Sequence, residues 1–414
     1  MQAADLRHVP LSERSQSATD LFLVFAGANI VATTLQVGAT VANGLSLPAA
    51  LAAIAVGSLF GASLVAAITP AGCRLGVPSI IATRAALGFR GAALVALLLY
   101  VTNFAWIALN NVIAASVVGR ALPGVADERV WIAVLGLAAT FVVALGPAAV
   151  GRADRVAVPL MAVAGLLMTW GCLRLPWPEA APANSNSAGW IGGFDVVVGY
   201  QVSWLLMFAD YPRYTADARR GAIAVFAGLA IAALWFMPIG LVTARLAGSA
   251  DPGAMVAVTG FGRWGAVLVA LATLTTNFVN IYMSALAWKS LRPQTRDQAA
   301  IWTIGLVGTV LSLAGGVWLD RFADFMMLIG GALVPIGGIL FAQFVLLRRN
   351  PIVEDLYRAP GPYTASGGWL PAGCVAWAAG AITYYLTANV GATLPTLLVS
   401  ILIHTALSHW LPRR

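Results

Sequence analysis

Charged side chains are scarce in this chain of 414 residues: Asp, Glu, Lys and Arg make up 10%, whereas hydrophobic residues make up 60%. A soluble globular domain carries roughly a quarter charged residues. The mean hydropathy of +0.85 agrees with this imbalance. The composition therefore excludes an ordinary soluble domain and indicates a polytopic membrane protein whose surroundings are the lipid bilayer.

Cysteine and histidine are also rare, with three residues of each. The cysteines share no motif spacing, so they predict neither a disulfide nor a zinc site: Cys73, Cys172 and Cys374. The histidines precede the first apolar run or lie in the last one, without a spacing typical of nucleophilic or metal-dependent catalysis: His8, His404 and His409. We expect no enzyme and no cofactor.

We expect no signal peptide either, because the first twenty residues are charged and lack an apolar core. The first apolar run is then expected to act as the insertion signal. Although the net charge is +8, the basic residues fall in short breaks between apolar runs rather than on one patch. They predict membrane topology and no binding of nucleic acid.

Twelve apolar runs are long enough to cross a bilayer core of about 30 Å. They start near residues 21, 47, 91, 130, 156, 190, 221, 265, 299, 322, 370 and 391. With the N-terminus inside, 18 of the 24 basic residues lie in inside segments and 6 in outside segments. The positive-inside rule therefore predicts twelve spans with both termini cytoplasmic, in the inner (plasma) membrane.

The apolar run over residues 271–286 contains hydroxyls and carboxamides. Thr276, Asn280 and Ser284 recur at i, i+4 and i+8, with Thr275 and Asn277 beside them, so a helix carries them as one stripe. Polar groups in hydrocarbon need a partner from protein, an ion or a ligand. Such residues can simply join neighbouring helices. The whole stripe, with similar stripes elsewhere, favours a transport site.

Glycine accompanies polar residues in the middle of two spans. Residues 27–30 read Gly-Ala-Asn-Ile in the first span, and residues 199–204 read Gly-Tyr-Gln-Val-Ser-Trp in the sixth. Helices that unwind at such places free backbone carbonyls to face a cavity, and matched breaks are typical of an inverted five-plus-five repeat. Glycine also allows close helix packing, which is the simpler interpretation of each break alone.

The third span places an indole between two carboxamides. Asn103, Trp106 and Asn110 lie at i, i+3 and i+7, on one helix face. An indole can stack on a flat ring, and uncharged amides can donate to or accept from its nitrogens and carbonyls. The alternative is packing of Trp106 in the core with the asparagines bound to other helices. The pattern favours a site for a planar heterocycle.

Several motifs, in their order and spacing, resemble nucleobase:cation symporter family one, which includes cytosine permease and the hydantoin transporter. They are residues 27–29, 44–46, 74–76, 84–88, 210–214 and 275–277, with Trp106. The resemblance implies an all-α membrane protein with the inverted-repeat fold of the leucine transporter and two further C-terminal helices. It also implies a sodium ion between spans one and eight and a planar heterocycle between spans three and six.

Carried onto this sequence, the resemblance implies two sets of site residues. The Na⁺ set is Gly27, Ile30, Ala272, Thr275 and Thr276. The substrate set is Asn29, Asn103, Trp106, Asn110, Gln201, Trp204, Asn277 and Asn280. Hydroxyls and carbonyls suit a hard cation such as Na⁺ without a buried anion. Gln201 stands where the hydantoin-type member has an aromatic residue, and Trp204 lies one turn later, which leaves the second stacking partner open.

The sequence thus predicts secondary active import of a heterocycle such as cytosine by Na⁺ symport, with H⁺ as the alternative ion, in a protein that functions as a monomer. Alternatives are hydantoin, the pyrimidine precursor of thiamine, an amino-acid or amine permease of the same fold, and a channel. The expected segments are 1–19 and 348–369 (cytoplasmic), 20–177 and 190–347 (the repeats), 178–189 (an external linker) and 370–414 (the last two spans).

Overall fold

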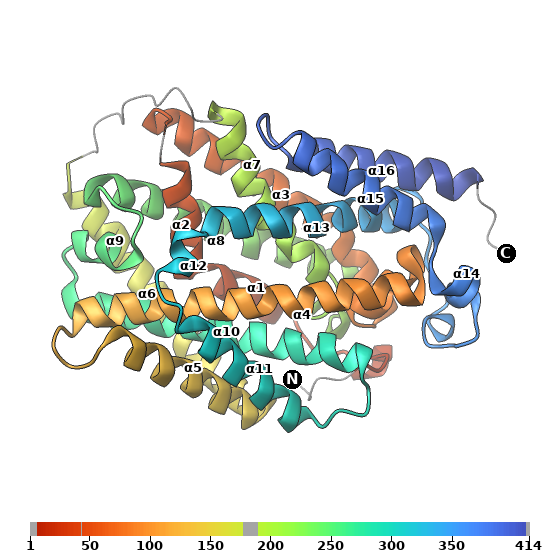
Figure 1. Ribbon diagram of the computed structural model, residues 1–414, viewed down its shortest axis with the longest axis horizontal. Helices are drawn as coiled ribbons and strands as arrows, with labels where there is room; N and C mark the ends of the chain where they lie inside the picture. Colours follow the sequence, from red (N-terminus) through yellow and green to blue (C-terminus); the bar gives the residue numbers. More distant parts are fainter. Residues whose placement is uncertain (1–5, 43, 177–188, 411–414) are drawn as a thin grey trace.

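The computed structural model describes residues 6–42, 44–176 and 189–410, and these residues form helices joined by turns and loops, without a strand (Figure 1). The α-helices are α1 Ala18–Asn29, α2 Ala32–Val41, α3 Leu47–Leu75, α4 Ser79–Ala121, α5 Glu128–Ala144, α6 Pro147–Arg174, α7 Gly189–Val202, α8 Ala218–Ala247, α9 Pro252–Val258, α10 Gly262–Leu291, α11 Asp297–Ser312, α12 Val317–Asp320, α13 Phe322–Phe341, α14 Ala365–Gly368, α15 Pro371–Leu386 and α16 Thr393–Trp410. Short 3₁₀ helices cover Leu11–Glu13, Ser203–Met207, Pro212–Tyr214, Glu354–Leu356 and Pro362–Thr364, and a π-helical turn covers Ala342–Leu346.

A helix lies at each of the twelve places where the sequence predicts a span. By length and apolar composition, four helices of the described part can cross a membrane, α3, α4, α8 and the stretch Asp324–Leu346. A fifth span results if α1 and α2 count as one broken helix. The predicted external linker falls almost wholly on residues 177–188, outside the described residues, as do residues 1–5 and 411–414.

The first span is broken, as the sequence predicts, although the break falls at Ile30 and Val31, just after the glycine. Helix α1 begins with a capping box in which Ser17 and Asp20 bond each other's backbone N–H. Val31 is extended, and the axes of α1 and α2 differ by 58°. The hydroxyl of Thr34 donates to the carbonyl of Asn29 over 2.6 Å. This side chain replaces one helical hydrogen bond that the break removes.

The sixth span also changes conformation at the predicted place. Helix α7 ends at Val202, and the chain continues in the 3₁₀ helix Ser203–Met207 rather than in α-helix. Tyr200, near the end of α7, bonds the hydroxyl of Thr34 over 2.8 Å. Because that hydroxyl gives its proton to Asn29, the phenol is the donor in this contact. The two interrupted spans are therefore joined beside their breaks.

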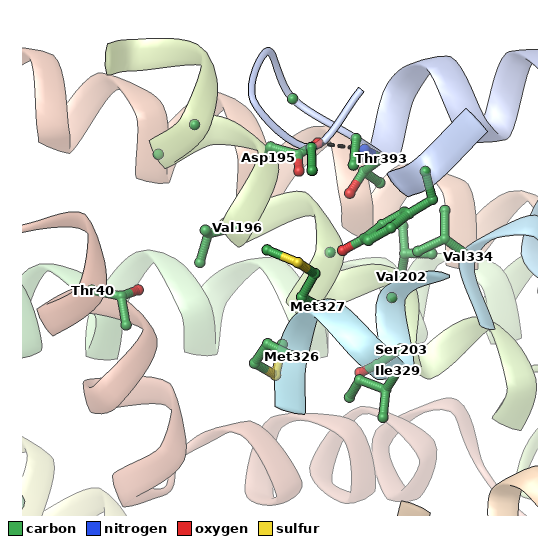
Figure 2. Close-up of a pocket in the computed structure, with 18 of the residues that line it drawn as sticks. Thr40, Asp195, Val196, Val202, Ser203, Met326, Met327, Ile329, Val334 and Thr393 are labelled. Atoms are coloured by element: carbon green, nitrogen blue, oxygen red, sulfur yellow. Dashed lines mark hydrogen bonds between the residues drawn. The ribbon is translucent and has the colours of Figure 1, made fainter. Parts of the chain in front are cut away.

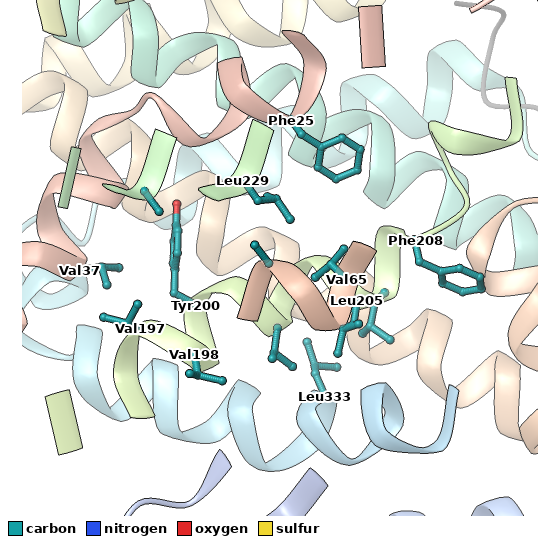
Figure 3. Close-up of a cluster of buried hydrophobic side chains, with 14 of the residues drawn as sticks. Phe25, Val37, Val65, Val197, Val198, Tyr200, Leu205, Phe208, Leu229 and Leu333 are labelled. Atoms are coloured by element: carbon teal, nitrogen blue, oxygen red, sulfur yellow. The ribbon is translucent and has the colours of Figure 1, made fainter. Parts of the chain in front are cut away.

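The hydrophobic core lies between the broken helices and their long neighbours (Figure 3). It brings together Phe25 of α1, Val37 of α2, Val65 of α3, Leu229 of α8 and Leu333 of α13. Helices α4 and α10 run side by side across the molecule, whereas α15 and α16 pack together on α13 at one edge (Figure 1). This arrangement leaves the breaks facing α4 and α10.

Helices α2 and α8 approach each other as closely as backbones allow. A Cβ atom at Gly38 would lie 2.0 Å from the carbonyl oxygen of Met237, and one at Gly240 would lie 2.0 Å from that of Leu35. Only glycine fits at such a reciprocal contact. The glycines hold the second half of the broken span against α8.

Candidate substrate and ion site

A cavity of about 80 Å³ lies between α4, α10, the break of the first span and the end of α7. Five residues of the predicted substrate set line it: Asn103, Trp106, Asn110, Trp204 and Asn280. Thr276, which belongs to the predicted ion set, lines it as well. The volume corresponds to about three liquid waters, which suits a small flat molecule. The described residues around this cavity carry no charge.

Two indoles from different elements face this cavity. Trp106 comes from α4, and Phe325 of α13 packs against it edge to face at 5.2 Å between ring centroids. Trp204 comes from the 3₁₀ helix after α7, and Phe25 of α1 tilts against it at 5.6 Å. Aromatic neighbours of this kind fix the position of an indole without covering all of its surface. The pair offers apolar walls for a ring.

Carboxamides gather on the α4–α10 side of the cavity. The Asn277 oxygen accepts hydrogen bonds from the amide nitrogens of Asn110 and Asn280, each over 3.3 Å. The Asn277 nitrogen donates to the Asn111 oxygen over 2.8 Å. Asn277 is buried behind the cavity wall, while Asn110 and Asn280 line the wall itself. Within the predicted stripe, Asn277 thus joins the two helices, whereas Asn280 faces the cavity.

Two predicted substrate residues are directed elsewhere in this structure. Asn29 is fully buried, and its amide nitrogen donates to the carbonyl of Phe25 in its own helix over 2.9 Å. Gln201 is fully buried too, and its nitrogen donates to the carbonyl of Leu229 in α8 over 3.4 Å. Neither is among the described residues that line the cavity. Of the two residues predicted from the sixth span, Trp204 is the one that lines the cavity.

Part of the predicted ion set meets at the same place. The Thr276 hydroxyl oxygen is buried and has no hydrogen-bond partner among the described residues. Ala28, between Gly27 and Ile30 at the end of α1, lines the same cavity. Gly27 carries one of the last four carbonyls of α1, which lack intrahelical partners. Hydroxyl and carbonyl oxygens without a nearby anion are a suitable donor set for Na⁺.

The other two members of the ion set lie next to this region. The hydroxyl of Thr275 points to the thioether of Met161 in α6, with 3.7 Å between oxygen and sulfur. Ala272 lies one turn earlier in α10, and its side chain is outside the described part of the structure. Helix α10 contacts α1 and α6. The predicted ion set therefore belongs to α1, the break that follows it and α10, and Thr275 points toward α6.

Several polar residues that line the cavity are not in the predicted substrate set. They are Tyr200, Ser203, Thr33 and Thr102. Tyr200 and Ser203 stand inside the interrupted stretch of the sixth span, so the break itself was the available signal. Thr33 follows the break of the first span in the same way. A break in a helix marks its neighbours in sequence as candidates, whatever their helical phase.

A second cavity of about 400 Å³ adjoins the first, between α2, α7, α13 and α15 (Figure 2). Ser203 and Leu333 line both cavities. Its walls are largely apolar, and Met326, Met327 and Val334 point into it (Figure 2). Asp195 lies at its rim, where a carboxylate oxygen accepts from the backbone N–H of Thr393 at the start of α16 over 2.6 Å. The two cavities are therefore neighbours that share part of their walls.

Comparison with solved structures identifies the fold. The fold matches a structure of Mhp1, a nucleobase-cation-symport-1 family transporter, in a closed conformation with bromovinylhydantoin bound. The TM-score is 0.83 at 20% sequence identity, and the match covers 98% of this chain and 94% of that chain. The predicted all-α, leucine-transporter-like fold is thereby confirmed.

Comparison of sequences then places the chain within a family. Residues 8–403 match the family described as permease for cytosine/purines, uracil, thiamine, allantoin, and the chain belongs to this family. It is 28% identical over 381 residues to YxlA of Bacillus subtilis (strain 168), whose name makes it a candidate purine-cytosine permease; the match covers 86% of this chain and 82% of YxlA. It is 25% identical over 352 residues to the cytosine permease of Escherichia coli (strain K12), covering 83% and 81%. The protein is a membrane permease and not an enzyme, as the sequence predicts.

Proposed function

We propose that this permease imports a planar nitrogen heterocycle with one ring, such as cytosine, by symport with Na⁺. The observation that carries the proposal is the small uncharged cavity, which combines two indoles, several carboxamides and a buried Thr276 hydroxyl beside a broken helix. An uncharged wall favours a neutral ring over a zwitterionic amino acid, because a buried charge needs a paired charge or an ion.

In the proposed mechanism Na⁺ binds Thr275, Thr276 and the backbone carbonyls at the end of α1, while the ring binds between Trp106 and Trp204. Both ligands then contact α10 and the first span, so each favours the conformation that the other binds. Alternating access moves the broken spans relative to α4 and α10. We propose further that the protein lies in the plasma membrane. It would cross the membrane twelve times, with both termini in the cytoplasm.

Uptake of labelled cytosine into proteoliposomes with and without an inward sodium gradient tests this function. We expect accumulation only with the gradient, and competition by unlabelled heterocycles but not by amino acids. The competition panel includes hydantoin and the pyrimidine precursor of thiamine, because the names of the related permeases refer to different heterocycles. Uptake that persists after both sodium and proton gradients are collapsed would contradict symport.

A further inference from the structure

Asn277 is a buried junction in the wall between α4 and α10. Its side chain is 1% exposed, and its two polar atoms make four hydrogen bonds to residues of α4 and α10. The nitrogen bonds the backbone carbonyl of Ile107 and the side chain of Asn111; the oxygen bonds Asn110 and Asn280. The partners of the oxygen are the two carboxamides that line the cavity.

A carboxamide can turn its oxygen and nitrogen either way, but a backbone carbonyl can only accept. The carbonyl of Ile107 lies 3.3 Å from the Asn277 nitrogen, so this end of the amide must be the donor. The opposite end, which faces Asn110 and Asn280, is then the oxygen. Asn110 and Asn280 must both turn their nitrogens toward Asn277.

A second backbone carbonyl fixes the same direction from the other side. The Ser312 hydroxyl gives its proton to the carbonyl of Gly308 over 2.7 Å, so its oxygen accepts from Asn111 over 3.1 Å. The Asn111 nitrogen is used there, and its oxygen receives the nitrogen of Asn277. Both ends of the network therefore demand the same orientation of Asn277.

The consequence reaches the cavity through Asn110. Its nitrogen is committed to Asn277, and its oxygen is buried without a hydrogen-bond partner among the described residues. A buried amide oxygen that lacks a donor is costly, and a ligand that supplies an N–H removes this cost. An acceptor atom placed there instead would add repulsion to the missing bond.

We propose that Asn277 is a specificity-determining positioning residue, which fixes the oxygen of Asn110 as a hydrogen-bond acceptor in the α4–α10 wall. The substrate class is then a flat heterocycle with an N–H, either in the ring or on an exocyclic amino group, at the edge that meets Asn110. Rings that present only oxygen or bare nitrogen at this edge are rejected. This inference rests on the proposed function and names the chemical feature that the site selects.

Asn103 provides a contrast on the same face of α4. It lines the cavity, but its nitrogen is buried without a partner among the described residues, and no backbone carbonyl fixes its orientation there. Its amide is therefore able to turn to suit either a donor or an acceptor. Replacement of Asn103 should weaken binding without changing the preference for an N–H, which makes it a matched control.

The test compares cytosine with two analogues: one carries a methoxy group in place of the amino group, and the other carries a ring oxygen in place of the ring N–H. These are 4-methoxypyrimidin-2-one, which lacks the amino group, and 4-amino-1,3-oxazin-2-one, which lacks the ring N–H. Dissociation constants are measured by calorimetry on the purified full-length protein in sodium buffer. We expect one analogue to bind about 10- to 100-fold more weakly than cytosine, as loss of one hydrogen bond to a buried group predicts.

Three variants then separate the network from the rest of the site. Asn277→Ala should bring cytosine and the rejected analogue to nearly equal affinity, because Asn110 can then turn its nitrogen outward. Asn110→Ala should also bring the two affinities together, because it removes the acceptor itself. This variant takes the place of Asn277→Ala if that protein does not fold. Asn103→Ala should keep the full ratio.

Two results would overturn the inference while leaving the proposed function intact: equal binding of cytosine and both analogues to the unmodified protein, or loss of the ratio in Asn103→Ala but not in Asn110→Ala. If hydantoin binds and cytosine does not, the same test uses 1-methylhydantoin and 3-methylhydantoin, each of which lacks one ring N–H. The control is 5-methylhydantoin, which carries the extra methyl group but keeps both N–H groups. Failure of both parent rings to bind would overturn the proposed function, and this inference with it.

Discussion

The hydroxyl of Thr276, a member of the predicted ion set, differs from the indole of Trp106 in the kind of ligand that it can bind. It lines the small cavity and is buried without a hydrogen-bond partner among the described residues. Trp106 lines the same cavity but offers only an aromatic surface. At the scale of single residues, ion binding and ring binding should therefore be separable by substitution.

Thr276→Ala should weaken the sodium dependence of substrate binding far more than Trp106→Ala does at the same substrate occupancy. Removing the hydroxyl takes one oxygen from the proposed Na⁺ site and leaves the indoles in place. We expect the sodium concentration for half-maximal binding to rise about tenfold or more, as loss of one ligand to a charged group predicts. Sodium titrations of substrate binding on purified protein measure it.

Ser284→Ala is the control for this prediction. Ser284 lies two turns further along α10, and its hydroxyl is also buried without a partner among the described residues, but it is not among the residues that line the cavity. Its removal should leave the sodium titration unchanged. An unaltered sodium dependence in Thr276→Ala would remove Thr276 from the ion site.

At the scale of elements, the contact between α2 and α8 holds the broken span in place. Gly38 and Gly240 face the backbone of the opposite helix, each with room for no more than a hydrogen atom. The tilt of 58° between α1 and α2 depends on what α2 packs against. Side chains at these glycines would separate the two helices and move the break.

Gly38→Leu should lower the thermal stability of the detergent-solubilised protein and weaken substrate binding. The added side chain would collide with the carbonyl of Met237, and overpacking of this kind costs about 1–3 kcal/mol or more. Gly119→Ala is the control, because a Cβ there has its nearest neighbour at 3.9 Å. A melting temperature for Gly38→Leu that equals that of the control would show that α2 can shift at no cost.

At the scale of the whole molecule, the fold brings the two breaks together against α4 and α10. The cavity that results is lined by residues from the first, third, sixth, eighth and tenth predicted spans. The large cavity lies beside it, between α2, α7 and α13, and shares Ser203 and Leu333 with it. The proposed coupling of ion and substrate and the expected orientation in the membrane would both be properties of this whole arrangement.

Na⁺ and substrate should each tighten the binding of the other by the same factor, because linkage between two binding equilibria is reciprocal. Calorimetric titrations of substrate at low and saturating sodium, and of sodium at low and saturating substrate, measure the two factors. Equal factors greater than one are expected. Independence of the two affinities would contradict coupling through the shared helix α10.

The two termini should lie on the same, cytoplasmic side of the membrane. In a background without Cys73, Cys172 and Cys374, His8→Cys and His409→Cys should react with a membrane-impermeant maleimide only after cells are permeabilised. Arg129→Cys, at an exposed position expected outside, should react in intact cells. Labelling of only one terminus in intact cells would exclude an even number of spans.

Helical periodicity was sufficient for the face of α4. Asn103, Trp106 and Asn110 lie inside one continuous stretch of helix, so their spacing alone placed them on the cavity side. The break in the first span was predictable to within a few residues, because glycine beside polar residues in two spans matched the positions expected of an inverted repeat. Composition by itself determined that the chain is a membrane protein.

Periodicity was insufficient for the sixth span, because the chain changes from α-helix to 3₁₀ helix between Val202 and Ser203. The angle per residue changes there, so the face of Trp204 cannot be extrapolated from that of Gln201. Only the tertiary structure turned Gln201 toward α8 and Trp204 toward the cavity.

The tertiary structure also decided what the predicted polar stripe does. The sequence by itself determined that Asn277 and Asn280 lie on one side of α10, because the helical repeat requires it. The carbonyl that directs Asn277 belongs to Ile107, 170 residues earlier in the chain. A hydrogen bond of that kind depends on how two helices pack, and local sequence carries no information about the direction of an amide.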